Sequence, residues 1–216
     1  MKKSLPWLRL ALTYAILFAV PGAPLKTGLL LTLWIAAFAP WKKSDAALFV
    51  SCAALFTAMN AAAIQRGLFE FTAPNVLGLP YWEFFLWGFW VLHTHRIAGG
   101  PPAPRPGRWE WGLVVLFALS FVLFQSATAV LLASGAVMSA ALVRWHERDD
   151  VHHVAHMLLI GTLLEYPGVA LGLWRYPDPP VGGVPLWYAT MWGGIGLFLR
   201  RWATPLAARL NGAALP

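Results

Sequence analysis

Two acidic residues of this chain lie inside long apolar stretches, where a charge is costly. Glu83 follows a Gly-x-Pro sequence at the start of one stretch, and Glu165 lies near the end of another. Burial in an apolar medium favours the neutral carboxylic acid, which can donate a proton, so both residues are candidate general acids. The alternative for each is an interhelical hydrogen bond with no catalytic role.

A second group of residues has side chains that commonly bind metals. It stands where the stretch containing Glu165 begins, and it comprises Asp149, His152, His153 and His156. Spacings of three, four and seven residues place these side chains on one face of a helix. Imidazoles with a carboxylate are typical ligands of zinc or non-haem iron, so the pattern predicts a Zn or Fe site that His93 and His95 could approach. A solvated helix entrance is the alternative interpretation.

The elements that must position these residues are membrane helices. The chain has 216 residues, of which 59% are hydrophobic and only 12% are charged, and this composition predicts a polytopic integral membrane protein. The net charge of +7 does not indicate nucleic-acid binding, because the basic residues are scattered singly or in pairs between apolar runs. The expected partner is therefore membrane lipid.

Hydropathy predicts an all-α fold of about eight transmembrane helices. The apolar segments are residues 6–22, 25–40, 45–65, 78–95, 109–124, 127–144, 151–173 and 186–201. The run from Trp111 to Val143 would be about 50 Å long as one helix, which exceeds a hydrocarbon core of about 30 Å. We therefore divide it at the polar cluster of Gln125, Ser126 and Thr128.

The distribution of basic residues predicts the orientation of these helices. With eight spans and the N-terminus inside, 13 of the 16 Lys and Arg residues fall on the cytoplasmic side. Only Lys26, Arg66 and Arg175 fall on the opposite side. Because positive residues favour the cytoplasmic ends of spans, both termini are expected in the cytoplasm.

An internal repeat divides the chain in two. A shift of 105 positions aligns residues 67–96 with residues 172–201 without a gap, and 11 of the 30 positions are identical. Upstream the shift becomes 104, which pairs Trp7 with Trp111. The sequence therefore predicts two four-helix repeats, residues 1–104 and 105–216. Each contains an even number of spans, so the repeats should be parallel and related by an axis along the membrane normal.

Packing of the repeats about this axis would form a cleft that combines polar and aromatic side chains. Asn60 aligns with Glu165, and Tyr188 aligns with Glu83, so the acids are not duplicated. We expect the cleft to bind a long apolar substrate with the catalytic acids beside it. Its substrate-binding residues would be Asn60, Trp82, Trp87, Trp187 and Tyr188.

The first repeat resembles the membrane-embedded lycopene cyclase domain. The resemblance lies in Gly67, Phe69, Phe71, Gly78, Pro80, Glu83 and Trp87, and the second repeat similarly resembles bacterioruberin hydratase and related carotenoid-biosynthesis membrane proteins. It implies acid-catalysed modification of an isoprenoid or carotenoid end group, with Glu83 as the proton donor. The sequence departs from the family in having Trp82 in place of the first glutamate of a pair.

Two other functions follow from other features of the sequence. The histidine cluster favours a metal-dependent membrane enzyme that acts at the cytoplasmic face. The duplicated bundle itself suits a small transporter or a scaffold, in which the intramembrane acids bind protons or join helices.

Overall fold

The chain forms eight helical rods within residues 5–100, 103–177 and 181–210, which the computed structural model describes. The rods are α1 (Leu5–Ala19), α2 (Ala23–Phe38), α3 (Lys43–Gln65), α4 (Glu83–Ala98), α5 (Arg108–Leu123), α6 (Ala127–Arg144), α7 (Arg148–Ala170) and α8 (Trp187–Phe198). The last rod continues through a π-helical turn, η1 (Leu199–Ala203), into α9 (Thr204–Arg209). The prediction of an all-α fold with eight helices is confirmed.

The long apolar run of the second half is divided at the predicted polar cluster. Helix α5 ends at Leu123 and α6 begins at Ala127. The hydroxyl of Ser126 accepts a hydrogen bond from the backbone N–H of Ala129 at 3.1 Å and so caps the first turn of α6. Ser126 divides the run because its hydroxyl satisfies a backbone N–H that the start of a helix leaves unpaired.

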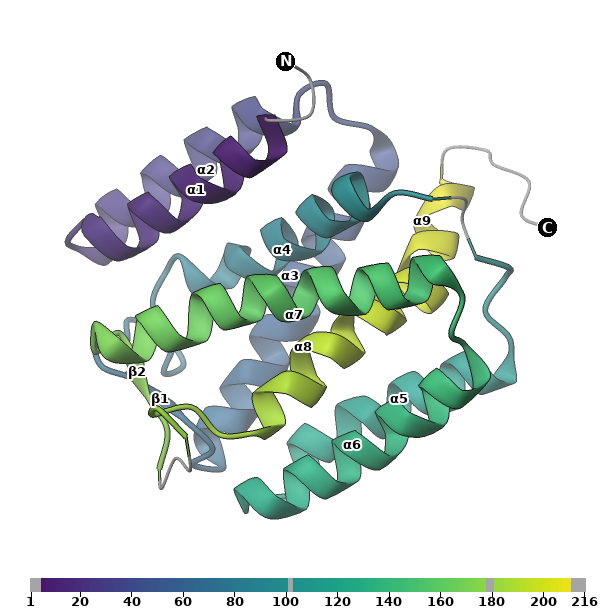
Figure 1. Cartoon of the computed structure of the whole chain (residues 1–216). Helices are drawn as coiled ribbons and strands as arrows, with labels where there is room; N and C mark the ends of the chain where they lie inside the picture. Colours follow the sequence, from purple (N-terminus) through teal and green to yellow (C-terminus); the bar gives the residue numbers. More distant parts are fainter. Residues whose placement is uncertain (1–4, 101–102, 178–180, 211–216) are drawn as a thin grey trace.

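Four helices form the centre of the bundle and two helical hairpins flank it. Figure 1 shows α3, α4, α7 and α8 in the middle, with the α1–α2 hairpin on one side and the α5–α6 hairpin on the other. The start of α1 and the end of α9 lie at one end of the bundle. A two-stranded antiparallel sheet of β1 (Glu70–Phe71) and β2 (Trp174–Arg175) lies at the opposite end.

The exterior of the bundle is apolar, as expected of a protein in lipid. Large hydrophobic side chains are exposed on the flanking hairpins, among them Leu8, Leu132 and Val143. Among the described helices, α3 and α6 are long and apolar enough to cross a membrane by themselves, and α1 and α2 are shorter apolar helices. Exposed leucines and valines over so much of the surface are favourable in a bilayer and unfavourable in water.

Local geometry recurs along the chain at the spacing of the sequence repeat. Gly67 and Gly172 have φ angles of 72° and 68°, and Gly78 and Gly183 have φ angles of 80° and 84°. Such positive values favour glycine. The bridges Val76–Leu79 and Val181–Val184 also recur at this spacing, and Glu70 of β1 pairs with its own counterpart Arg175 of β2.

Aromatic rings fill the middle of the bundle. Trp87 of α4 stacks on Trp192 of α8, with ring centroids 4.7 Å apart, although the two residues are 105 positions apart in sequence. Trp90 and Phe89 are fully buried beside them. This packing brings the centres of the two halves together around the acidic residues.

Candidate functional site

A cavity of about 40 Å³ lies between the two halves. It is lined by Asn60, Phe69, Phe71, Glu83, Leu86, Trp87, Trp90, Leu164, Glu165, Trp174, Tyr176, Trp187, Met191 and Trp192. A space of this size holds about three water molecules. The structure therefore brings the two acids to one cavity, as the sequence predicts, but this cavity is too small for the long apolar substrate expected there.

Glu165 is held by hydrogen-bond donors on both of its oxygens. Trp192 donates to Oε1 at 3.0 Å, while Trp174 and Tyr176 donate to Oε2 at 3.0 and 2.6 Å. Burial raises the pKa of the Tyr176 phenol well above its ordinary value, and Glu165 adds to this effect. The phenol therefore stays protonated as a donor, and the carboxyl group of Glu165 is fixed in place.

Glu83 has one bonded oxygen and one oxygen without a partner. Its Oε1 accepts hydrogen bonds from Asn60 Nδ2 at 2.6 Å and from Trp87 Nε1 at 3.0 Å. Its Oε2 has no hydrogen-bond partner within the described residues. Glu83 lines the cavity and is only 4% exposed. Its carboxyl group is thus oriented by the protein and keeps a free acceptor for another molecule.

Two of the predicted substrate-binding residues lie outside the cavity lining. Trp82 packs on Phe71 and Trp174, which themselves line the cavity. Tyr188 lies against the ring of Tyr166, with its hydroxyl 3.4 Å from Thr162 Oγ1. Of the polar residues expected in the cleft, Asn60 lines the cavity with the two acids, whereas the Tyr188 hydroxyl interacts with α7 away from it.

Sequence reasoning missed three of the donors to Glu165. Trp174 and Tyr176 belong to the loop that follows α7, and Trp192 is the repeat counterpart of Trp87. Both Trp87 and Trp192 donate to an acid. Their separation by the repeat length of 105 positions was the signal that could have predicted a shared role.

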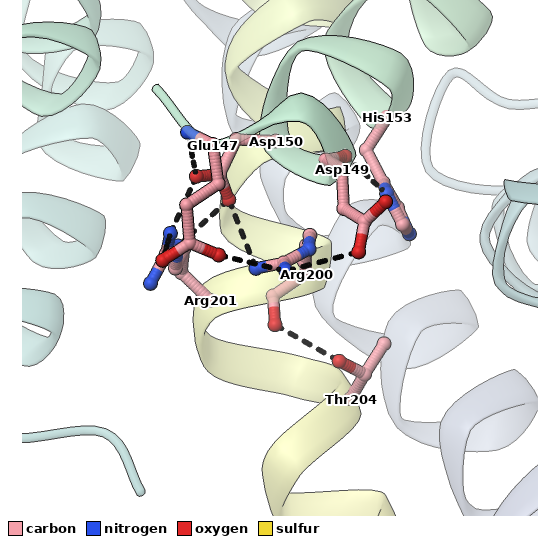
Figure 2. A network of polar contacts seen from close by, with 7 residues as sticks. All are labelled: Glu147, Asp149, Asp150, His153, Arg200, Arg201 and Thr204. Atoms are coloured by element: carbon pink, nitrogen blue, oxygen red, sulfur yellow. Dashed lines mark hydrogen bonds and ion pairs between the residues drawn. The ribbon is translucent and has the colours of Figure 1, made fainter. Parts of the chain in front are cut away.

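The predicted metal ligands turn toward different partners. The carboxylate of Asp149 lies 3.4 Å from Arg200, and the Nδ1 atom of His153 lies 2.8 Å from the carbonyl oxygen of Asp149 (Figure 2). His152 is exposed, while His156 is buried beside His93, with ring centroids 5.8 Å apart. Across the described ranges, no three His, Cys, Asp or Glu side chains converge to hold one metal ion. The Zn or Fe prediction therefore gains no support from the geometry.

A buried ion-pair network occupies the end of the bundle where metal was predicted. Asp150 is fully buried and accepts hydrogen bonds from Arg201 Nε at 2.7 Å and from Arg200 Nη1 at 3.1 Å. Glu147 also pairs with both arginines (Figure 2). In the first half, Asp45 pairs with Arg96 at 2.5 Å. Asp45 and Arg96 precede Asp150 and Arg201 by 105 positions. The sequence repeat therefore contained the signal that could have predicted these ion pairs.

Comparison with solved structures identifies proteins of similar fold. The chain has the fold of MvINS, a mycobacterial Insig homologue from Mycobacterium vanbaalenii. One crystal structure of MvINS matches with a TM-score of 0.60 and 21% identity over 78% of this chain and 97% of MvINS. A second, of a cross-linked MvINS trimer, matches with a TM-score of 0.64 and 19% identity over 81% and 98%. No family model and no curated protein matches the sequence.

The resemblance to the lycopene cyclase domain is therefore wrong, because the structural match is to an Insig homologue. The physical reason lies in the motif. Gly78 adopts a positive φ in the turn before α4, and Pro80 follows it; Gly183 and Pro185 do the same before α8. These residue types are needed for a turn that leads into a helix, so they report local geometry and not a family.

Proposed function

We propose that this polytopic membrane protein of Insig-like fold binds an amphipathic lipid whose polar group donates a hydrogen bond to Glu83. The observation that carries this proposal is the free Oε2 atom of Glu83 at the cavity, beside an Oε1 atom that already has two donors. The other three carboxyl oxygens of Glu83 and Glu165 each accept a hydrogen bond from a side chain of the protein. An incoming hydroxyl or amine supplies the donor that Oε2 lacks.

The shape of the cavity limits which part of the lipid enters it. About 40 Å³ accommodates a hydroxyl or a small amine but no chain. Phe69, Phe71 and Trp187 offer apolar surface around this polar position. The lipid chain therefore lies between helices and only its polar group reaches Glu83, a binding role that requires no chemical step.

A matched pair of ligands tests this function. The purified protein is titrated with 1-hexadecanol and with its methyl ether, and binding is followed by fluorescence of the cavity tryptophans. A hydrogen bond to a neutral carboxyl group contributes about 0.5–1.5 kcal/mol net, so the alcohol should bind about 2- to 10-fold more tightly than the ether. Equal binding of the alcohol and the ether to wild type would contradict the proposal.

A variant then locates the contact. In Glu83→Gln, the preference for the alcohol should disappear, because the amide can no longer offer two acceptor oxygens. Glu110→Gln is the matched control, since Glu110 caps α5 and lies outside the cavity lining. It should keep the wild-type preference.

A second candidate function is acid catalysis on an isoprenoid-like lipid. It is favoured by the placement of the buried Glu83 and Glu165 side chains at one cavity. Glu83 would transfer its proton to a carbon–carbon double bond, and its carboxylate would take a proton back from the resulting cation, which completes an isomerisation. Conversion of an isoprenoid alcohol by wild type should fall about 100-fold or more in Glu83→Gln. Absence of conversion by wild type would rule out catalysis on this substrate, and binding would be the remaining proposed function.

We also propose that residues 1–104 and 105–216 are parallel four-helix repeats with both chain ends in the cytoplasm. The recurring turns and the pairing of Glu70 with Arg175 support a two-fold relation, because equivalent strands that meet across a two-fold axis run antiparallel. The excess of basic residues at one predicted side supports the orientation.

A further inference from the structure

Three side chains rich in hydrogen-bond donors meet where α1, α4 and α7 come together. Arg9, His93 and His156 are 9%, 0% and 5% exposed, respectively. The rings of His93 and His156 lie 5.8 Å apart, and Arg9 is close enough to His93 to interact with it electrostatically. This donor cluster is separate from the cavity of Glu83 and Glu165, whose lining contains none of the three.

The donor cluster lacks acceptors. Both ring nitrogens of His93, Nε2 of His156 and Nε of Arg9 are buried without a hydrogen-bond partner. Arg9 has no carboxylate partner among the residues that the structure describes, and its guanidinium lies 4.5 Å from the ring centroid of Phe38. A fully buried imidazole whose two ring nitrogens lack partners carries an uncompensated desolvation cost, so the presence of His93 here indicates a binding role.

The equivalent position in the other half shows that the fold does not need these polar groups. The repeat shift pairs Arg9 with Leu113, His93 with Phe198 and His156 with Ser51. Phe198 packs against Phe117 at 5.1 Å between ring centroids. Leu113 and Phe198 are apolar and Ser51 is exposed, so this architecture does not require Arg9 and His93 for packing.

We propose that the donor cluster of Arg9, His93 and His156 binds a phosphate group. The planar guanidinium of Arg9 suits two phosphate oxygens. A neutral imidazole has one N–H donor and one lone pair, and a phosphate monoester monoanion offers both oxygen acceptors and a P–OH donor to match them. A carboxylate supplies only acceptors. The phosphate is that of a phospholipid headgroup or of the free ion.

Thermal unfolding of the purified protein in detergent tests the proposal with three probes. Dioleoyl phosphatidic acid should raise the midpoint of unfolding, because a ligand that binds only the folded state stabilises it. Dioleoyl phosphatidylcholine, a phosphodiester without a P–OH, should give no shift. A shift with phosphatidic acid alone assigns the site to a lipid, and a shift with inorganic phosphate as well assigns it to the phosphate group itself. No shift with either overturns the proposal.

Three single variants on three helices replace each donor by its repeat counterpart. Arg9→Leu, His93→Phe and His156→Ser should each weaken binding of phosphatidic acid about 10-fold or more, since each removes a charge-assisted or buried hydrogen bond. Arg105→Leu and His146→Ser are controls at exposed positions and should bind as wild type does. Wild-type affinity in all three cluster variants overturns the proposal.

Stability without ligand separates binding from a structural role. Removal of a buried donor that has no acceptor relieves a desolvation penalty, so Arg9→Leu and His93→Phe should unfold at the same temperature as wild type or higher in the absence of phosphate. Lower unfolding temperatures for both variants, together with unchanged affinity for phosphatidic acid, would show that the cluster only supports the fold.

Discussion

The two halves of the chain use equivalent ion pairs at the same end of the bundle but bury them to different depths. In the first half, the side chain of Arg96 is 26% exposed where it meets Asp45. In the second half, the side chains of Arg201 and Asp150 are 7% and 0% exposed. Both pairs consist of an aspartate and an arginine at equivalent positions of the repeat. The residues around each pair therefore set the difference in burial.

The second half also recruits further charges. Its η1 turn directs the consecutive residues Arg200 and Arg201 toward the start of α7, where Glu147, Asp149 and Asp150 lie (Figure 2). The counterpart of Arg200 in the first half is His95. A buried charge needs several partners to offset its desolvation, which explains why the more deeply buried pair lies inside a network.

The largest expected effect follows from breaking this network. Asp150→Asn should lower the free energy of unfolding by about 3–5 kcal/mol, because it leaves two buried arginines short of a carboxylate. Asp45→Asn should cost about 1 kcal/mol, because water reaches Arg96 and screens its charge. Reversible unfolding in a series of mixed micelles measures both. Equal losses in the two variants would show that burial does not distinguish the pairs.

A smaller difference is expected at a matched pair of glycines. A Cβ atom on Gly88 would lie 2.6 Å from the backbone carbonyl oxygen of Phe49, which cannot move freely. On Gly193 it would lie 2.6 Å from the end of the flexible Met138 side chain. Gly88→Ala should therefore cost about 2–3 kcal/mol and Gly193→Ala less than about 1 kcal/mol. The same unfolding assay checks the order, and the reverse order would contradict the close approach of Gly88 to the backbone of Phe49.

The last test concerns the orientation of the two repeats in the membrane and not their stability. Reporter insertions at Gly22 and Ser126, in the loops that follow the first helix of each half, should lie on the same side of the membrane if the repeats are parallel. An insertion at Gly100 and a fusion at Pro216 should lie on the other side, in the cytoplasm. Opposite sides for Gly22 and Ser126 would indicate inverted repeats and would rule out the proposed two-fold axis along the membrane normal.

Much of the fold could be predicted from the sequence because it depends on local properties. Apolar segments predict helices wherever the surrounding solvent is lipid, and Ser126 predicts the break between α5 and α6 through its capping hydroxyl. Glu83 and Glu165 could be selected because a carboxyl group within such a segment needs a reason to be there. The repeat could be found because identical turns require glycine and proline at the same spacing.

The partners of these residues were decided only by the tertiary structure. Glu165 is held by Trp174, Tyr176 and Trp192, and none of these follows from helical spacing because a loop and a second helix bring them together. The histidine face predicted a metal site, but Asp149 pairs with an arginine 51 positions away. Spacing along a helix fixes which side chains share a face, whereas the packing of distant helices fixes what that face meets.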